Sequence, residues 1–266
     1  IFSEKEGYTK GNALALWKNL YRNKVESWAE CVNVNEKYLT AIKKQYSLQL
    51  PQVKIKRIAT DKTVKFLLEL SDGNLIESVL MHNKYGMSLC ITSQVGCNMG
   101  CSFCASGLLG KKRDLMVGEF ISQIMVANQY IKKNIASAKV VTNVVIMGIG
   151  EPFDNYENFK KAVTILKEEN GLAIASRKIT VSTSGLSPQI INFANDNINI
   201  NLAISLHSPN DEMRSKIMKV NKVYDIKNLM GAVDYYLERS NKRITFEYIL
   251  FKNINDNLEC ARELAK

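Results

Sequence analysis

The sequence predicts an α/β fold built on a parallel sheet, preceded by a small helical region and a short antiparallel β meander. Apolar, β-branched runs that predict strands lie near residues 87–95, 141–147, 178–184, 200–206 and 243–250. Helical patterns separate these runs, and strand–helix units in series place their strands in parallel. We therefore expect three regions: a helical accessory region at 1–50, a β meander at 51–85, and a βα region at 86–266.

The first two regions differ in their hydrophobic periodicity. An apolar stripe with helical spacing comprises Leu14, Leu16, Trp17, Leu20 and Tyr21, and a second, more polar helix is predicted near 33–46. From Val53 the segments VKIKRIA, TVKFLLEL and NLIESVLM read as strands, and Ser71-Asp72-Gly73-Asn74 forms a turn between the last two.

Composition restricts the class of protein. The 266 residues are 46% hydrophobic, which is enough for a sizeable core, and they include 36 Lys and Arg against 26 Asp and Glu. The net charge of +10 suggests a polyanionic partner such as nucleic acid, although an ordinary basic surface remains open. No apolar stretch of about 20 residues and no signal-peptide layout occurs, so we expect a cytoplasmic protein without a membrane segment.

Chemistry-bearing residues recur where the predicted strands end. The motifs Gly148-Ile149-Gly150-Glu151, Ser182-Thr183-Ser184-Gly185 and Ser205-Leu206-His207 each follow a strand, and a cysteine cluster follows the first one. Parallel strands bring their carboxyl ends to one edge of the sheet. Each motif alone is weak, because a Gly-x-Gly after a strand is commonly just a turn. Their shared position predicts a site at this edge.

The cysteine cluster is the most specific signal. Cys97, Cys101 and Cys104 form a C-x3-C-x2-C pattern in CNMGCSFC. Three thiolates from one short loop can hold a [4Fe–4S] cluster and leave its fourth iron open. That iron can bind the amino and carboxylate groups of S-adenosylmethionine (SAM) and pass it an electron, which releases a 5′-deoxyadenosyl radical.

A structural zinc ion or three unrelated thiols are the alternatives. Structural zinc takes four ligands, and His82 and His207 are remote in sequence from the three cysteines. Cys31 and Cys260 lie in helical patterns and are expected to be bystanders. In a reducing cytosol a disulfide scaffold is disfavoured for a chain of this length.

Several segments together resemble a known family. SLCITSQVGCNMGCSFCASG is followed by VVIMGIGEPFDNY, ITVSTSG, LAISLHSPNDEMR and ITFEYIL. These segments resemble the RlmN family of radical SAM RNA methyltransferases over roughly residues 10–266, and its sister family Cfr shares much of the first block. The resemblance implies a partial (βα)6 barrel, a helical N-terminal RNA-binding region, and methylation of C2 of an adenine in 23S rRNA, possibly also in tRNA.

The family's reaction, carried over by motif, uses two cysteines. One carries the methyl group as methylcysteine, and the other, which matches Cys90, resolves the covalent protein–RNA adduct by forming a disulfide. The family's general base matches Glu77, for which a solvated strand residue is the alternative. Matching also assigns SAM binding to Gly150, Glu151, Ser182, Ser205, Leu206 and His207. On physical grounds we expect Gly148 and Gly150 to open the strand end, so that backbone can meet the methionine amino group.

The remaining expectations concern partners and the ends of the chain. Candidate RNA contacts are Lys54, Lys56, Arg57 and Lys111-Lys112-Arg113, with a solvated charged face as the alternative. A flavodoxin-type electron donor and a monomeric state are also expected. The sequence begins at Ile1, and it ends at Lys266, before the family's methyl-carrying cysteine, which Cys260 does not match; we therefore expect a piece of a longer protein.

Two competing functions stay open at this point. A Cfr-like enzyme would methylate C8 instead of C2, but the chain has the GIGEP form with Pro152, where Cfr proteins tend to have Ala. A non-catalytic iron–sulfur or RNA-binding fragment is the other alternative.

Overall fold

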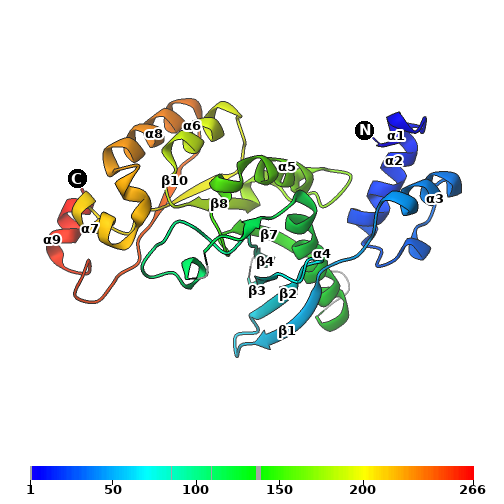
Figure 1. Ribbon diagram of the computed structural model, residues 1–266, viewed down its shortest axis with the longest axis horizontal. Helices are drawn as coiled ribbons and strands as arrows, with labels where there is room; N and C mark the ends of the chain where they lie inside the picture. Colours follow the sequence, from blue (N-terminus) through cyan, green and yellow to red (C-terminus); the bar gives the residue numbers. More distant parts are fainter. Residues whose placement is uncertain (1, 85, 109, 136–138) are drawn as a thin grey trace.

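The computed structural model describes residues 2–84, 86–108, 110–135 and 139–266, so the region boundary predicted at residue 85 falls outside the described residues. The N-terminal helices form a unit at one end of the molecule (Figure 1). Its helices are α1 (Phe2–Lys5), α2 (Lys10–Trp17), the π-helical turn η1 (Lys18–Asn23), the 3-10 turn η2 (Trp28–Glu30) and α3 (Glu36–Gln45).

The N-terminal unit has a small core of its own. Leu16, Tyr38 and Ile42 are buried together, whereas Leu14, which the predicted stripe included, is 39% exposed. Leu14 and Leu16 are two positions apart in the same α-helix, so they lie on different sides of it; after Trp17 the helix continues as a π-helical turn. Glu26 pairs with Lys133 at 2.8 Å and so ties this unit to the larger part of the chain.

One eight-stranded sheet organises the rest of the chain. Its antiparallel part is the predicted meander, β1 (Gln52–Ile58), β2 (Val64–Glu69) and β3 (Leu75–Asn83), which is followed by β4 (Gly86–Cys90). Its parallel part continues from β4 through β7 (Val141–Ile146), β8 (Ile179–Thr183), β9 (Asn201–Ser205) and β10 (Ile244–Glu247). The strand order is β1-β2-β3-β4-β7-β8-β9-β10, and the mixed α/β class is the predicted one.

Helices follow each parallel strand, and most of them cover one face of the sheet (Figure 1). They are α4 (Val117–Asn134), α5 (Tyr156–Lys167), α6 (Ser187–Asn195), α7 (Asp211–Ile217), α8 (Ile226–Arg239) and α9 (Leu258–Leu264). The short 3-10 turns are η3 (Ala105–Gly107), η4 (Pro152–Asn155), η5 (Ser176–Lys178) and η6 (Lys219–Lys222). Apolar side chains of β4, β7, β8 and β9 meet the helices in one core. Among the described residues, no helix combines the length and apolar character needed to cross a membrane.

Two strands end earlier than the sequence predicted, and both early ends shape the site. The run predicted at 87–95 divides, because the chain bends after Cys90 and Gln94–Val95 becomes β5, paired with β6 (Arg113–Asp114). The run predicted to reach residue 250 stops at Glu247, whose carbonyl oxygen accepts from both Leu206 and His207 backbone N–H groups.

Candidate functional site

The register of the sheet places the predicted site residues on one face. Val79 is paired with Cys90, and because side chains alternate along a strand, Glu77 shares the face of both. From Cys90 the same face continues through the paired residues Val145 and Thr180 to Ser182, and through Ala203 to Ser205 and Glu247. This is the face opposite the helices, because Leu89, Val144, Ile146, Val181, Leu202 and Ile204 on the other side are buried in the core.

A carboxylate joins two of the serines assigned to SAM. Glu247 Oε2 accepts hydrogen bonds from Ser182 Oγ at 2.6 Å and from Ser205 Oγ at 2.9 Å. The two hydroxyl oxygens lie 3.5 Å apart. All three side chains are partly exposed at the carboxyl ends of β8, β9 and β10. Ser182, Ser205 and Glu247 form a polar cluster, called the serine step below, that can offer hydroxyl donors and a carboxylate acceptor to a ligand on this face of the sheet.

The Gly148–Glu151 loop packs tightly against the end of β4. A Cβ on Gly148 would lie 2.7 Å from the carbonyl oxygen of Ile91, and one on Gly150 would lie 2.5 Å from Cβ of Gln94. Gly150 also has φ +99°, which L side chains rarely adopt. We expected these glycines to open the strand end for a ligand. The structure shows instead that their missing side chains admit the neighbouring loop.

Gln94 and Glu151 link the rim loops to one another. Gln94 is fully buried; its Oε1 accepts from Glu151 N–H at 2.9 Å, and its Nε2 donates to Asp114 and Asp154 at 2.8 Å each. The buried Glu151 carboxylate accepts from the backbone N–H groups of Phe153 at 2.9 Å and Ser184 at 2.7 Å. Burial raises the pKa of Glu151. Its side chain therefore joins the ends of β7 and β8. Because the carboxylate is used in this way, only the backbone of Glu151 can contact a ligand.

The loop with the three cysteines lies between β5 and β6. Gly96 and Gly100 both have positive φ, and a Cβ on Gly96 would collide with the carbonyl oxygen of Gly110. Cys97 is buried, while Cys101 and Cys104 are partly exposed. Burial, together with negative charge on the other two thiols, raises the pKa of Cys101 to about 11. The three sulfurs are thus close enough to repel one another when ionised, so a bound cation is needed to hold them as thiolates.

This donor set fits an iron–sulfur cluster. Among the residues that the structure describes, no group of three His, Cys, Asp or Glu side chains converges on a point that would hold a single metal ion. A cluster distributes its ligands over several irons, so three cysteines on one loop can bind it without converging.

His207 supports the cysteine loop from below. Its ring packs edge-on against Phe103, which lies between the second and third cysteines, with centroids 5.2 Å apart. Nδ1 accepts from the Ile249 backbone N–H at 3.2 Å, which assigns the ring proton to Nε2. Burial lowers the pKa of His207, so the ring is neutral near pH 7.

Glu77 and Cys90 lie on the adjacent strands β3 and β4, and both are on the sheet face opposite the helices. The Glu77 carboxylate pairs with Lys65 at 2.7 Å, and its carbonyl oxygen accepts from Thr92 Oγ1 at 2.6 Å. Cys90 is half-buried, and burial raises the pKa of its thiol. The structure therefore brings both residues to the same face as the serine step.

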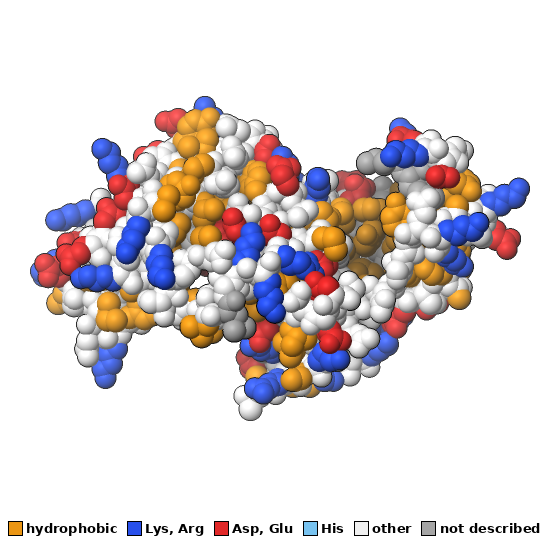
Figure 2. Space-filling view, viewed as in Figure 1, with side chains coloured by type: hydrophobic (Ala, Val, Ile, Leu, Met, Phe, Trp, Pro, Cys, Tyr) orange, Lys and Arg blue, Asp and Glu red, His pale blue; other side chains and the backbone are white. Residues whose placement is uncertain are grey.

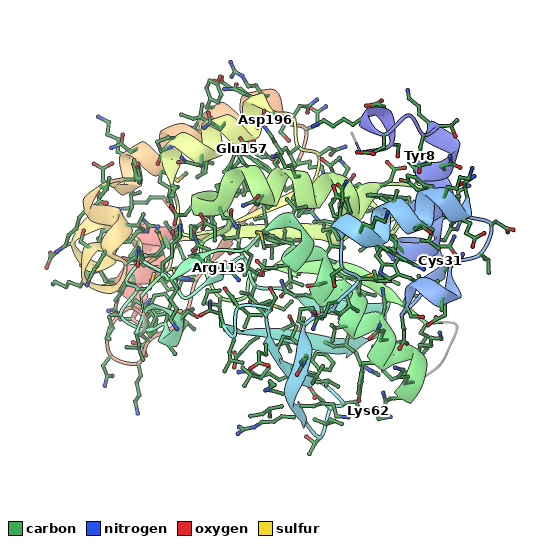
Figure 3. The ribbon with its side chains drawn as sticks, turned by 45° about the vertical axis from the view of Figure 1, so that its right-hand side comes forward. Tyr8, Cys31, Lys62, Arg113, Glu157 and Asp196 are labelled. Atoms are coloured by element: carbon green, nitrogen blue, oxygen red, sulfur yellow. The ribbon has the colours of Figure 1, made fainter. Side chains whose placement is uncertain are left out.

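The basic run after the cysteine loop is engaged in ion pairs. Lys111 pairs with Asp114 and Asp154 at 2.8 Å each. Arg113 binds Asp72 at 2.7 Å and holds both carboxylate oxygens of Glu119 at 2.7 and 2.8 Å. Figure 3 shows Arg113 in the central part of the molecule, apart from Cys31 on the N-terminal unit. Lys111 and Arg113, which were candidates for RNA contact from the sequence, therefore tie the loop to neighbouring segments through these ion pairs.

Comparison with known proteins agrees with this geometry. Residues 91–264 match the model of the Radical SAM superfamily. The chain is 48% identical over 262 residues to a probable dual-specificity RNA methyltransferase RlmN of Shouchella clausii, covering 98% of this chain and 73% of that protein. The protein of the same name from Streptococcus gordonii is 46% identical over 265 residues, which cover 100% of this chain and 73% of that protein.

The chain belongs to the RlmN family of radical SAM proteins. A crystal structure of a radical SAM methyltransferase from Sphaerobacter thermophilus has the same fold, with a TM-score of 0.92, 35% identity, and coverage of 99% of this chain and 76% of that one. Radical SAM proteins use a [4Fe–4S] cluster and S-adenosylmethionine, so these are the cofactors of this RlmN family member.

Sequence reasoning missed two residues of the site, and it also missed the buried Arg214, whose guanidinium donates to the carbonyl oxygens of Ser184 and Ser205 at the strand ends. Glu247 lies within ITFEYIL, and its position at a strand end was the available signal. Gln94 and Arg214 also lie within the quoted segments, but nothing in their spacing distinguishes a buried polar residue from an exposed one. Their roles depend on partners from distant parts of the chain.

Proposed function

We propose that this chain is the catalytic part of an RNA methyltransferase that methylates C2 of an adenine in 23S rRNA through a methylcysteine relay, with tRNA as a second substrate to be tested. The observation that carries the proposal is that Glu77 and Cys90 share one sheet face with Ser182, Ser205 and Glu247. A base and a thiol thus face the same space as the cofactor rim. The names of the similar proteins support RNA as the substrate.

The cysteine loop provides the cofactor site in this proposal. Cys97, Cys101 and Cys104 would hold the [4Fe–4S] cluster, which supplies the electron that cleaves SAM. Backbone at Gly150 and Glu151, together with the Ser182–Ser205 step, would orient the methionine and ribose groups. Leu206 and His207 would bound the site beneath the loop, where His207 contacts Phe103.

Glu77 and Cys90 would complete the transfer. An adenine C2 that has accepted a carbon radical from methylcysteine must lose one proton and one electron. In this proposal Glu77 would take the proton, and the electron would return to the iron–sulfur cluster. Cys90 thiolate would then attack the sulfur of the methyl-carrying cysteine, forming a disulfide as that sulfur's bond to the substrate carbon breaks. The electron pair of the broken bond, with a proton, leaves a methyl group on C2.

RNA would contact the molecule away from the cofactor loop. All seven residues of β1 are exposed, including Lys54, Lys56 and Arg57. Lys54 pairs with Glu69 at 2.9 Å and Lys56 lies over the ring of Tyr130, so Arg57 is the strongest candidate for a phosphate contact. Figure 2 shows Lys and Arg side chains spread over the face in view instead of gathered in one patch. A cytoplasmic location, a flavodoxin-type donor and a monomeric state remain part of the proposal.

The test has two stages. In the first, the protein is reconstituted anaerobically with iron and sulfide and then mixed with dithionite and SAM. We expect 5′-deoxyadenosine, and we expect Cys97→Ala, Cys101→Ala and Cys104→Ala to lose the iron absorbance. Cys31→Ala, in the N-terminal unit, is the matched control and should retain it. A cluster that persists in all three variants would refute the ligand assignment.

In the second stage, RNA from cells that express the protein and lack their own enzyme is digested and analysed by mass spectrometry. 2-Methyladenosine supports the proposal, whereas 8-methyladenosine would transfer the protein to the Cfr-like alternative. RNA binding without 5′-deoxyadenosine in the first stage would favour a non-catalytic role. In a form of the protein that contains the methyl-carrying cysteine, Cys90→Ala should accumulate a protein–RNA adduct that survives denaturing electrophoresis, because its resolving thiol is absent.

A further inference from the structure

Arg214 is an unusual charged residue in the core of this protein. It lies on α7, is 0% exposed, and has the largest side chain among the fully buried residues. Its guanidinium donates to the carbonyl oxygens of Leu206 at 3.0 Å, Ser184 at 2.8 Å and Ser205 at 3.0 Å. A fourth bond goes to Asn221 Oδ1 at 2.8 Å. Every acceptor is neutral, so hydrogen bonds are satisfied while the positive charge is not.

The Asp211 carboxylate is linked to Arg214 only through the side-chain amide of Asn221. Asn221 Nδ2 donates to Asp211 Oδ1 at 2.9 Å, so an amide separates Arg214 from the exposed Asp211. The ion pairs formed by the described residues do not include Arg214. A buried cation without a direct counter-charge is unfavourable, because its hydration is lost and no opposite charge replaces it. A negative group that the protein itself does not supply would offset this cost.

The element that carries Arg214 is attached to the cysteine loop. Ser102 N–H donates to the carbonyl oxygen of Ile217, the last residue of α7, at 2.9 Å. The side chain of Lys219 lies against Gly100, where an added Cβ would come within 2.9 Å of Lys219 Cδ. On the other side, Arg214 holds the carbonyl oxygens at the ends of β8 and β9. Arg214 therefore lies at the junction between the cysteine loop and the two SAM-binding strands.

The charge of Arg214 interacts with negative groups near this junction. Burial lowers the pKa of Arg214 to about 10, and negative charge on Asp211 and on Cys101 acts in the opposite direction. Thiolates make a bound cluster negative, and one-electron reduction makes it more so. A fixed positive charge in a poorly solvated region stabilises the reduced form more than the oxidised form.

We propose that Arg214 is the buried counter-charge of the iron–sulfur cluster and raises its reduction potential. The proposal rests on the assignment of Cys97, Cys101 and Cys104 as ligands. Arg214 is a positioning residue, since it contacts protein atoms alone, but its charge assists the step in which an electron enters the cluster. Its hydrogen bonds to Ser184 and Ser205 hold that charge at a constant distance from the loop.

The test is a redox titration of the reconstituted protein without SAM, followed by electron paramagnetic resonance. Arg214→Gln should shift the midpoint potential to more negative values with iron content unchanged, while Arg214→Lys, which keeps the charge, should shift it by less than half as much. A purely structural role predicts lower melting temperatures for both variants and an unchanged potential in their intact clusters, which would overturn the proposal.

Two further variants serve as a control for burial and as a substitute if Arg214→Gln does not fold. Lys219→Met removes an exposed positive charge from the same junction and should leave the potential almost unchanged because solvent screens it; a shift equal to that of Arg214→Gln would overturn the role of burial. If Arg214→Gln does not fold, Asn221→Asp places a carboxylate against the retained guanidinium and should lower the potential. An unchanged potential in Asn221→Asp would overturn the proposal.

The result is separable from the proposed function. Absence of a cluster in the unsubstituted protein would contradict the ligand assignment itself. A normal cluster whose potential does not respond to Arg214→Gln would contradict the counter-charge alone.

Discussion

The carboxylate of Glu247 accepts the hydroxyl hydrogen of Ser182 at 2.6 Å, across two strands and 65 positions of sequence. The same oxygen accepts from Ser205, so one acidic side chain on β10 orients two hydroxyls on β8 and β9. This arrangement exists because the register aligns Glu247 with Ser205 and Ser182 with Ala203. The carboxyl ends of three strands thereby become one binding surface.

Removal of Glu247 should weaken SAM binding. Glu247→Ala frees both serine hydroxyls from their acceptor, and loss of a hydrogen bond to a charged group costs about 1.5–3 kcal/mol. We expect the dissociation constant for SAM, measured by calorimetry, to rise by roughly 10-fold or more. Thr245→Val changes the same face of β10 two residues earlier and should leave the constant unaltered. Equal effects of the two substitutions would exclude a specific role of Glu247.

Arg113 and its two carboxylate partners, Asp72 and Glu119, form a cluster that we call the Arg113 clamp, and this clamp should stabilise the protein in a pH-dependent way. The Arg113 guanidinium holds the pKa of Asp72 well below its usual range. A carboxyl group with a depressed pKa stabilises the fold above its unfolded pKa of about 4, and this stabilisation is lost as pH falls through the folded-state value. The difference in melting temperature between the unsubstituted protein and Asp72→Asn should thus be constant from pH 7 to about pH 4 and narrow below it.

Two companion variants calibrate the clamp. Arg113→Gln breaks the contacts with both Asp72 and Glu119 and should lower the free energy of unfolding by roughly 1 kcal/mol in denaturant titrations, since the pairs are partly exposed. Glu212→Gln breaks an exposed pair within α7 and should cause no measurable change. A loss on Glu212→Gln as large as that on Arg113→Gln would contradict this interpretation.

Two glycine substitutions should have opposite effects on stability. Gly150→Ala introduces a Cβ 2.5 Å from Gln94 at a positive φ, and it should cost more than about 2 kcal/mol. Gly231 lies on the exposed side of α8 with no atom within 4 Å of an added Cβ. Gly231→Ala should therefore stabilise by about 0.5–1 kcal/mol through the higher helix propensity of alanine. Thermal unfolding of both variants provides the comparison.

Substitution at β1 should distinguish RNA contacts from structural ion pairs. Arg57→Gln should weaken RNA binding and reduce the slope of log affinity against log salt by about 1. Lys111→Gln should lower stability and leave the slope unchanged, because its ammonium group already binds Asp114 and Asp154. Filter binding at several salt concentrations would measure the slopes. An unchanged slope for Arg57→Gln would exclude this residue as a phosphate contact.

Much of the fold could be predicted from local patterns. Period-2 alternation identified β1 to β3, and the Ser71–Asn74 turn separates the last two as expected. The α/β class followed because strand–helix units in series place their strands in parallel. The strand ends were less accurate, since the bend after Cys90 depends on hydrogen bonds from the Gly148–Gly150 loop.

The candidate site was predictable where the chemistry is local in sequence. Cys97, Cys101 and Cys104 lie within eight consecutive residues, so their spacing alone indicated a cluster ligand set. The ion pairs of Lys111 and Arg113 could not be predicted from the sequence, because a run of basic residues does not reveal that Asp72, Asp154 and Glu119 lie beside it. The roles of Gly148 and Gly150 also depended on a neighbouring loop.

The sequence by itself determined the kind of chemistry, because the donor atoms of the cysteine loop and the polar residues at strand ends are consequences of residue type and short spacing. Only the tertiary structure decided which charges are compensated. Arg113 and Arg214 are both arginines in polar contexts, yet one meets two carboxylates and the other meets neutral oxygens in a fully buried position. The difference arises because burial and partner identity are set by strands that pair across the sheet, over separations that no local pattern encodes.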